Sequence, residues 1–352
     1  MKAASVLLVG IATHPQTGHQ FKVLEQAGLH VILLDPYGQQ GQQASLVWQE
    51  EQIFWGGQDI SPARVDAVVV AGLPPDVPTQ DAFQQPENGQ LGWSAWYQQF
   101  GLQRDRSDVI LGLLLAYEAA GIPMFNPLAH TMASARKAYQ LAALRQSGCK
   151  LPATLLSSSP QAAEAFIRAQ GECVVKPVAG GALTISANAL LLNGKLSQLA
   201  AGPAIFQQRI DGENIRAIIL EDQVISCSAV AVPDDTLDFR ADPAYQQGKA
   251  RYRDVILPRI VQLQCRRAAM LLGLRFAGVD LKCTEQGEYF LLECDANPVY
   301  LDVEHASWAT RLHNNWLRRY PPCAEARWRS VPDQRPALPF CRASTSVCLP
   351  SS

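Results

Sequence analysis

The sequence lacks the patterns that mark several common classes of protein. Its nine cysteines are scattered and form no Cys-x-x-Cys pair, so neither a disulfide framework nor a zinc site is indicated. No apolar run approaches the ~20 residues that a membrane helix needs, and residues 1–10 are typical of a short strand rather than a signal peptide. We therefore expect a cytoplasmic protein with no membrane partner.

Further absences concern partners and catalysis. There is no long run of Lys or Arg and the formal charge is -2, which argues against nucleic acid as the main partner. No G-x-G-x-x-G follows the first apolar segment, Val6 to Gly10, so a nicotinamide-dependent oxidoreductase is disfavoured. The six histidines lack metal-like spacing, and no Ser-His-Asp or Cys-His pattern stands out. We therefore interpret the histidines as structural or exposed residues, with a partial exception for His14, which follows the first strand where α/β sheets place ligands.

The most informative feature that is present lies near the C-terminal end. Residues 276–281 and 288–293 are rich in apolar and aromatic side chains and flank a turn, which predicts a hairpin of two buried strands. Asp280 and Glu293 lie within these segments, and burying an unpaired carboxylate costs several kcal/mol. A divalent cation is the simplest compensation, and hard oxygen donors suit Mg²⁺.

The remaining pattern divides the chain into regions. Short apolar strands alternate with helices from Val6 to about Phe125, which predicts a parallel sheet, and the segment 73–101, rich in Pro, Gln and Gly, is predicted to be a loop. Residues 330–352, rich in Pro and Ser, are expected to be disordered. The other predicted elements are helices over 131–146 and 258–272, a helix from Val303, and strands over 173–177, 205–210, 215–220 and 224–230.

Basic residues between these segments suit a nucleotide triphosphate. Lys176 ends an apolar strand and is followed by Gly180 and Gly181, whose backbone amides could approach a phosphate. Taken alone, Lys176 is better interpreted as a surface lysine. Arg216 and Arg240 could bind a carboxylate or phosphate through two hydrogen bonds, or could equally be structural ion-pair partners.

The order of these pieces resembles the ATP-grasp ligases, most closely the RimK-like and glutathione-synthetase-like branch, from about Phe125 to Tyr320. The segment Leu237 to Arg240, followed by Tyr245, is also similar to ATP-grasp ligases that form macrocyclic links in ribosomal peptides. The segments that carry the resemblance are Lys137 on a helix after Asn126-Pro127, then Val174-Val175-Lys176-Pro177, Phe206 to Arg216, Ala277 to Asp280, and Leu292 to Pro298.

This resemblance implies a mixed α/β (α+β) fold of the ATP-grasp type. It implies a Rossmann-like pre-ATP-grasp domain over 1–126, a small subdomain over 127–203, a C-terminal subdomain with a magnesium site over 204–322, and a disordered tail over 323–352. Two departures stand out: Glu293-Cys294-Asp295 occupies a position where the family usually has Glu-x-Asn, and residues 178–184 of the phosphate-covering loop contain only two glycines.

The resemblance also implies roles for individual residues. Nucleotide-binding residues are Lys137, Lys176, Gly180, Gly181, Gln207, Gln208, Arg209, Ile210, Glu213 and Asn214. Catalytic residues are Arg216 and Arg240, and the ligands of Mg²⁺, with Mn²⁺ as an alternative ion, are Asp280, Glu293 and Asp295.

The implied activity is ATP-dependent ligation of a carboxylate to an amine through an acyl phosphate, with release of ADP and phosphate. The substrates are expected to be small molecules or peptides, and a homo-oligomer is compatible with the sequence. The alternative is a catalytically silent ATP-binding or scaffold protein of the same fold.

Overall fold

The computed structural model describes residues 4–35, 45–73, 93–180, 182–232 and 236–301. The helix expected from Val303, the tail expected over 323–352 and Gly181 lie outside the described residues. Among the described helices, none has the length and apolar character to cross a membrane. Two antiparallel sheets follow a parallel one along the chain.

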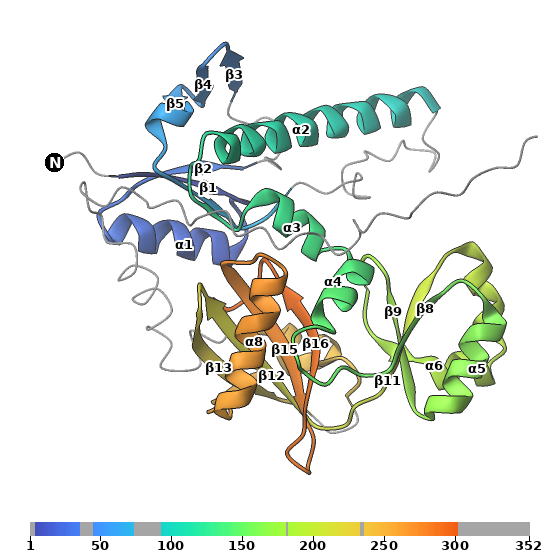
Figure 1. Ribbon diagram of the computed structural model, residues 1–352. Helices are drawn as coiled ribbons and strands as arrows, with labels where there is room; N and C mark the ends of the chain where they lie inside the picture. The colour runs from blue at the N-terminus through green and yellow to red at the C-terminus, as the bar shows by residue number, and fades with distance from the viewer. Residues whose placement is uncertain (1–3, 36–44, 74–92, 181, 233–235, 302–352) are drawn as a thin grey trace, which may run out of the picture.

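The N-terminal part contains a parallel sheet, as predicted, and helices cover both of its faces. Its strand order is β2-β1-β6-β7. Successive strand residues point to opposite faces, so Leu7 and Val9 pack on the side of α2, whereas Val6 and Leu8 pack with Leu24 of α1. Figure 1 shows α1 and α2 on opposite sides of this sheet. The elements are β1 (Ser5–Val9), α1 (Pro15–Gln26), β2 (His30–Leu34), β6 (Ala67–Val70), α2 (Trp93–Ala119) and β7 (Met124–Phe125), with a small meander of β3 (Leu46–Gln49), β4 (Gln52–Trp55) and β5 (Gln58–Asp59) and a 3-10 turn η1 (Pro62–Arg64).

Two predicted boundaries were wrong. Residues 93–101 belong to α2 rather than to a loop, because the last proline of the segment is Pro86 and the residues that follow can continue a helix. The helix predicted over 131–146 is two helices, α3 (Leu128–Ser134) and α4 (Lys137–Leu144), separated by the extended backbone of Arg136. The break makes Lys137 the first residue of α4.

The small antiparallel sheet has the order β10-β9-β11-β8. Its buried core contains Val175 and Phe206 of the strands, packed on Ile167 of α5. Lys176 and Gln207 lie next to these core residues in sequence and therefore point to the other face. The elements are β8 (Thr154–Ser157), α5 (Pro160–Gln170), β9 (Cys173–Pro177), β10 (Ile185–Ser186), α6 (Ala187–Leu192), η3 (Lys195–Ala201) and β11 (Ala204–Gln208).

The large antiparallel sheet has the order β14-β13-β12-β15-β16 and contains the predicted hairpin, which is confirmed. One face packs Ala217, Val279 and Cys294 against the buried side of α8, including Cys265. The other face is free to carry polar residues. The elements are β12 (Glu213–Leu220), β13 (Gln223–Ala231), η4 (Phe239–Ala241), α7 (Pro243–Gln246), β14 (Arg251–Asp254), α8 (Arg259–Leu271), β15 (Phe276–Cys283) and β16 (Tyr289–Asp295).

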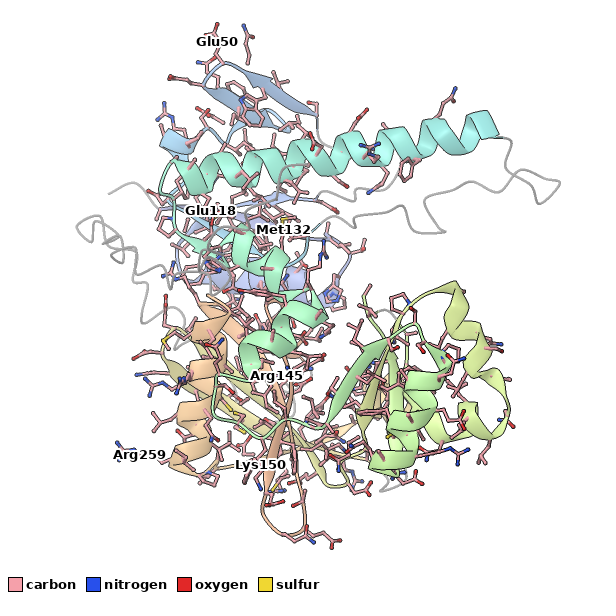
Figure 2. The ribbon with its side chains drawn as sticks, turned by 45° about the vertical axis from the view of Figure 1, so that its right-hand side comes forward. Glu50, Glu118, Met132, Arg145, Lys150 and Arg259 are labelled. Atoms are coloured by element: carbon pink, nitrogen blue, oxygen red, sulfur yellow. The ribbon has the colours of Figure 1, made fainter. Side chains whose placement is uncertain are left out.

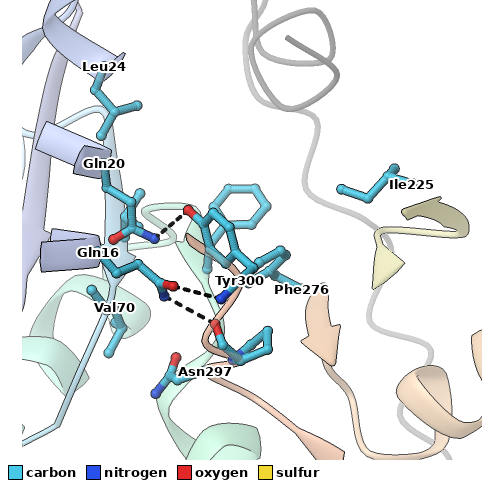
Figure 3. A pocket seen from close by; sticks show the side chains of 12 residues that line it. Gln16, Gln20, Leu24, Val70, Ile225, Phe276, Asn297 and Tyr300 are labelled. Carbon is cyan, nitrogen blue, oxygen red and sulfur yellow. Dashed lines mark hydrogen bonds between the residues drawn. The ribbon is translucent and has the colours of Figure 1, made fainter. Parts of the chain in front are cut away.

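Buried amide side chains tie the N-terminal part to the segment that follows β16. Gln16 of α1 donates to the carbonyl of Pro298 at 3.1 Å and accepts from the backbone N–H of Tyr300 at 2.8 Å. Gln20, one turn further, donates to the Tyr300 hydroxyl at 2.9 Å (Figure 3). Asn126, at the end of β7, donates to the carbonyl of Ala296 at 2.8 Å. The carboxyl end of the hairpin is therefore fixed against the first sheet.

Candidate active site

A row of charged side chains crosses three neighbouring strands of the large sheet. Arg216 of β12 lies directly opposite Asp280 of β15, and Asp280 lies directly opposite Glu293 of β16. Directly opposite residues of antiparallel strands project from the same face, so the three side chains lie together on the face away from α8. A register shift after Asp280 leaves Leu292 as the extra residue of β16, and such a bulge re-aims the neighbouring side chain.

Two cations compensate these carboxylates. Arg216 donates from Nε and Nη2 to the two carboxylate oxygens of Asp280, each at 2.7 Å. Lys137 Nζ lies 2.5 Å from Glu293 Oε2. Burial opposes the charge on both cations, but the carboxylates outweigh it, and the pKa values of Lys137 and Arg216 are raised. The sequence predicted buried carboxylates, but Asp280 and Glu293 are only half-buried, with side chains 14% and 34% exposed. Each has a cation of the protein as its partner and is also available as a metal ligand.

The third acidic residue completes a group of hard oxygen donors. Glu293 and Asp295 alternate along β16 and face the same side, and oxygen atoms of Asp280, Glu293 and Asp295 all lie within 4.8 Å of one another. Burial raises the pKa of Asp295 to about 7, and the carboxylates of Glu293 and Asp280 act in the same direction. Three converging carboxylate oxygens fit the ligand preference of Mg²⁺.

The carboxylate group lies in the wall of a cleft between the small and large sheets, with a volume of about 480 Å³. This lies within the ~300–1,000 Å³ typical of sites for small ligands. Asn214 lines the cleft, whereas the neighbouring Glu213 is not among the lining residues and pairs with Arg253 at 2.6 and 2.7 Å. The predicted residues that line the cleft are Lys137, Lys176, Gly180, Gln207, Gln208, Arg209, Ile210, Asn214, Arg216, Arg240, Asp280, Glu293 and Asp295.

Lys176 and Gln207 come from adjacent strands of the small sheet. Lys176 Nζ donates to Gln207 Oε1 at 2.9 Å, and Gln207 donates in turn to Thr154 Oγ1 at 3.1 Å. Burial lowers the pKa of Lys176, and the Lys137 charge adds to the lowering. An anion in the cleft would supply the charge partner that the neutral Gln207 does not.

Arg240 of η4 also lines the cleft and is held by Asp238. Its Nε and Nη2 contact the two carboxylate oxygens at 2.8 and 2.6 Å. Asp238 also accepts from the backbone N–H of Thr184 at 2.9 Å, so it joins the β9–β10 loop to η4. Burial opposes the charge of Asp238, but Arg240 and the Thr184 N–H outweigh it and lower its pKa to about 2.

Several residues of this region were absent from the predicted set, among them Asp238, Lys282, Asn297 and Gln140. Lys282 follows Asp280 by two positions on β15, so the period-two pattern of strands could have identified it, whereas Asn297 lies beyond the end of β16. Gln140 of α4 contacts the backbone of β16 at Cys294, for which the sequence offered no signal.

Comparisons with known proteins agree with this geometry. The RimK-like ATP-grasp domain family matches residues 134–309. The structure is similar to that of the ATP-grasp ligase PsnB complexed with a minimal precursor, with a TM-score of 0.73 and 27% identity over 90% of this chain and 99% of that chain. The macrocyclase MdnC, bound with precursor peptide MdnA from Microcystis aeruginosa MRC, has a TM-score of 0.69 and 19% identity over 90% and 98%.

The fold is also similar to that of a more distant ligase. D-alanyl-alanine synthetase A from Vibrio cholerae has a TM-score of 0.62 and 14% identity over 92% of this chain and 99% of that chain. No curated protein sequence matches the chain.

Proposed function

The chain belongs to the RimK-like ATP-grasp family, and on that premise we propose that it is an ATP-dependent ligase that joins a carboxylate to an amine. The observation that carries the proposal is the group Asp280, Glu293 and Asp295, which faces the cations Lys137 and Arg216 in one cleft. Such a site can hold a nucleotide triphosphate and the charge that develops on its transferring phosphoryl group.

A carboxylate must be activated before an amine can displace one of its oxygens, because its leaving group would otherwise be oxide. An oxygen of the substrate carboxylate attacks the γ-phosphorus of ATP, the bond from that phosphorus to the β–γ bridging oxygen breaks, and ADP leaves. The amine then attacks the acyl carbon of the acyl phosphate, phosphate departs with the C–O bond electrons, and the amine proton passes to solvent. Both steps depend on positioning and charge stabilisation rather than on a protein nucleophile.

We assign a role in binding ATP or the substrate to each residue according to its place in the cleft. Lys137 and Lys176 approach the phosphates from α4 and β9, while the strand end from Gln207 to Ile210 approaches the adenine side. Arg240 of η4 binds the substrate carboxylate or the transferring phosphoryl group, and Asp238 sets the orientation of its side chain.

Asp280, Glu293 and Asp295 would hold Mg²⁺, with Mn²⁺ as an alternative ion. When bound, the ion supplies charge neutralisation at the β- and γ-phosphates. The fit rests on hard oxygen donors that converge within 4.8 Å on one face of the hairpin. The solved structure of PsnB with Mg and ADP, at 27% identity, supports a site for magnesium beside an adenine nucleotide.

We further propose that at least one substrate group is part of a peptide. PsnB, with 27% identity and 99% of its chain covered, has been solved with a minimal precursor. The alternative, a silent ATP-binding protein, is favoured only by the two glycines of residues 178–184 and is an outcome of the test below.

The test needs no knowledge of the amine. Hydroxylamine captures acyl phosphates as hydroxamates, so we would incubate the protein with ATP, Mg²⁺, hydroxylamine and a panel of free amino acids and acidic peptides. We expect ADP and hydroxamate to form in equal amounts with some members of the panel. Formation of AMP and pyrophosphate would reject the acyl-phosphate route, and binding of ATP without any turnover would favour the silent protein.

A further inference from the structure

Among the residues that the structure describes, no strand pairs with the outer edge of β16, which ends the order of the large sheet. Two residues form hydrogen bonds with the backbone of β16 at this edge, where a neighbouring strand would otherwise do so. The carbonyl of Lys150, labelled near the hairpin in Figure 2, accepts from the N–H of Leu291 at 2.9 Å. Gln140 takes the next position: its Oε1 accepts from the N–H of Cys294 at 3.2 Å and its Nε2 donates to the Cys294 carbonyl at 3.0 Å.

These two contacts fall on the peptide groups that join the acidic residues. The N–H of Cys294 belongs to the peptide unit that follows Glu293, and its carbonyl belongs to the unit that precedes Asp295. Gln140 therefore holds both peptide planes between the two carboxylates. Because Cys294 itself points into the core, the side chains of Glu293 and Asp295 project from a backbone that is fixed on both sides.

Gln140 is itself fixed. It is 2% exposed, and its Nε2 also donates to the carbonyl of Ser134 at 2.8 Å, at the end of α3 where the helix breaks. It lies three residues after Lys137 on α4, on the same side of that helix, and Lys137 contacts Glu293. One short helix thus neutralises the Glu293 carboxylate and holds the backbone that presents it.

We infer that Gln140 is a positioning residue for the metal site, setting the geometry of Glu293 and Asp295 without touching a ligand or the reacting atoms. The inference rests on the proposed metal site and goes beyond it. Groups that hold metal ligands in place commonly change metal affinity by ~10- to 100-fold when removed. A role in stability alone would lower the melting temperature and leave metal affinity unchanged.

The experiment uses Mn²⁺ alone as the probe, with free Mn²⁺ measured by electron paramagnetic resonance. Gln140→Met keeps the length of the side chain and removes both contacts to Cys294. The matched control is Gln20→Met, a second buried glutamine whose amide contacts the Tyr300 hydroxyl rather than the backbone between the acidic residues. Gln140→Asn, one methylene shorter, reaches at most one of the two contacts and serves as a milder variant if Gln140→Met does not fold.

We expect Gln140→Met to raise the Kd for Mn²⁺ about tenfold or more, Gln140→Asn to raise it by an intermediate factor, and Gln20→Met to leave it unchanged. Gln140→Met loses three hydrogen bonds and Gln20→Met loses one, so the melting temperature is measured for both variants and Mn²⁺ affinity is the deciding measurement. Equal Mn²⁺ affinity in wild type and both Gln140 variants overturns the positioning role and leaves the proposed function standing. A wild-type protein that binds no Mn²⁺ overturns the metal site, and the inference with it.

Discussion

Asp280→Asn tests the charged row at the centre of the site. At an effective dielectric constant of 20, unit charges 2.7 Å apart attract by about 6 kcal/mol, the separation found between Arg216 and Asp280. The same substitution relieves repulsion from Glu293, whose oxygen lies within 4.8 Å, and at that limit the repulsion amounts to about 3 kcal/mol. An asparagine also retains one hydrogen bond to Arg216, so we expect a net loss of about 2 kcal/mol in the free energy of unfolding.

Glu288→Gln is the matched control on the same hairpin. Its partner is Lys150, and the two side chains are 48% and 58% exposed, so the substitution should cost less than about 1 kcal/mol. The assay is thermal unfolding with and without Mg²⁺ and ADP, together with substrate-dependent release of ADP. We expect a lower melting temperature for Asp280→Asn, no further stabilisation by Mg²⁺ and ADP, and a loss of turnover of at least about a hundredfold. A melting temperature equal to or above that of wild type would refute the reasoning, because repulsion among the carboxylates would then outweigh the Arg216 pair.

Three further substitutions examine other parts of the cleft. Lys176→Ala should raise the KM for ATP about tenfold or more with little change in melting temperature, because the hydrogen-bond partner of this lysine among the described residues is the neutral Gln207. An unchanged KM would remove Lys176 from the phosphate site. Asp295→Asn should retain turnover but require more Mg²⁺ for half-maximal rate, since one anionic ligand is lost, and a lower requirement in the Mg²⁺ titration would contradict this role. The pKa of Asp238, about 2, lies below its ordinary 3.8. The ionised carboxylate therefore adds about 2 kcal/mol to the free energy of unfolding above about pH 4, and this stabilisation is lost as the pH falls toward 2. Asp238→Asn should therefore be less stable than wild type at pH 7 and show a smaller decline in melting temperature between pH 5 and 3. If the melting temperatures of the two proteins instead fall in parallel, the folded protein does not lower the pKa of Asp238.

The sequence predicted the parts of the site that depend on local pattern. Carboxylates at Asp280 and Glu293 stood out because they interrupt apolar strands, and the two apolar segments that flank a turn correctly placed them in a hairpin. The parallel N-terminal sheet was predicted for a similar reason, since short apolar strands alternate with helices.

Other features depend on contacts between distant residues. The pairing of Arg216 with Asp280 joins residues 64 positions apart, and it follows from strand register rather than from any local pattern. The break between α3 and α4 contains no Pro or Gly, and the Ser134 carbonyl at the break accepts from the Gln140 side chain. Arg240 likewise takes its orientation from Asp238. The carboxylate of Asp238 also accepts from the backbone N–H of Thr184, and this contact between distant residues follows from the fold rather than from a local pattern.

The most direct test of the central claim follows an oxygen atom. A carboxylate substrate identified in the hydroxylamine screen would be labelled with ¹⁸O in its carboxyl group and turned over with ATP and Mg²⁺, and the released phosphate analysed by mass spectrometry. The account predicts one ¹⁸O atom in the phosphate for each ADP formed, because the attacking carboxylate oxygen stays with the γ-phosphoryl group. Release of unlabelled phosphate, or recovery of the label in AMP, would contradict activation through an acyl phosphate.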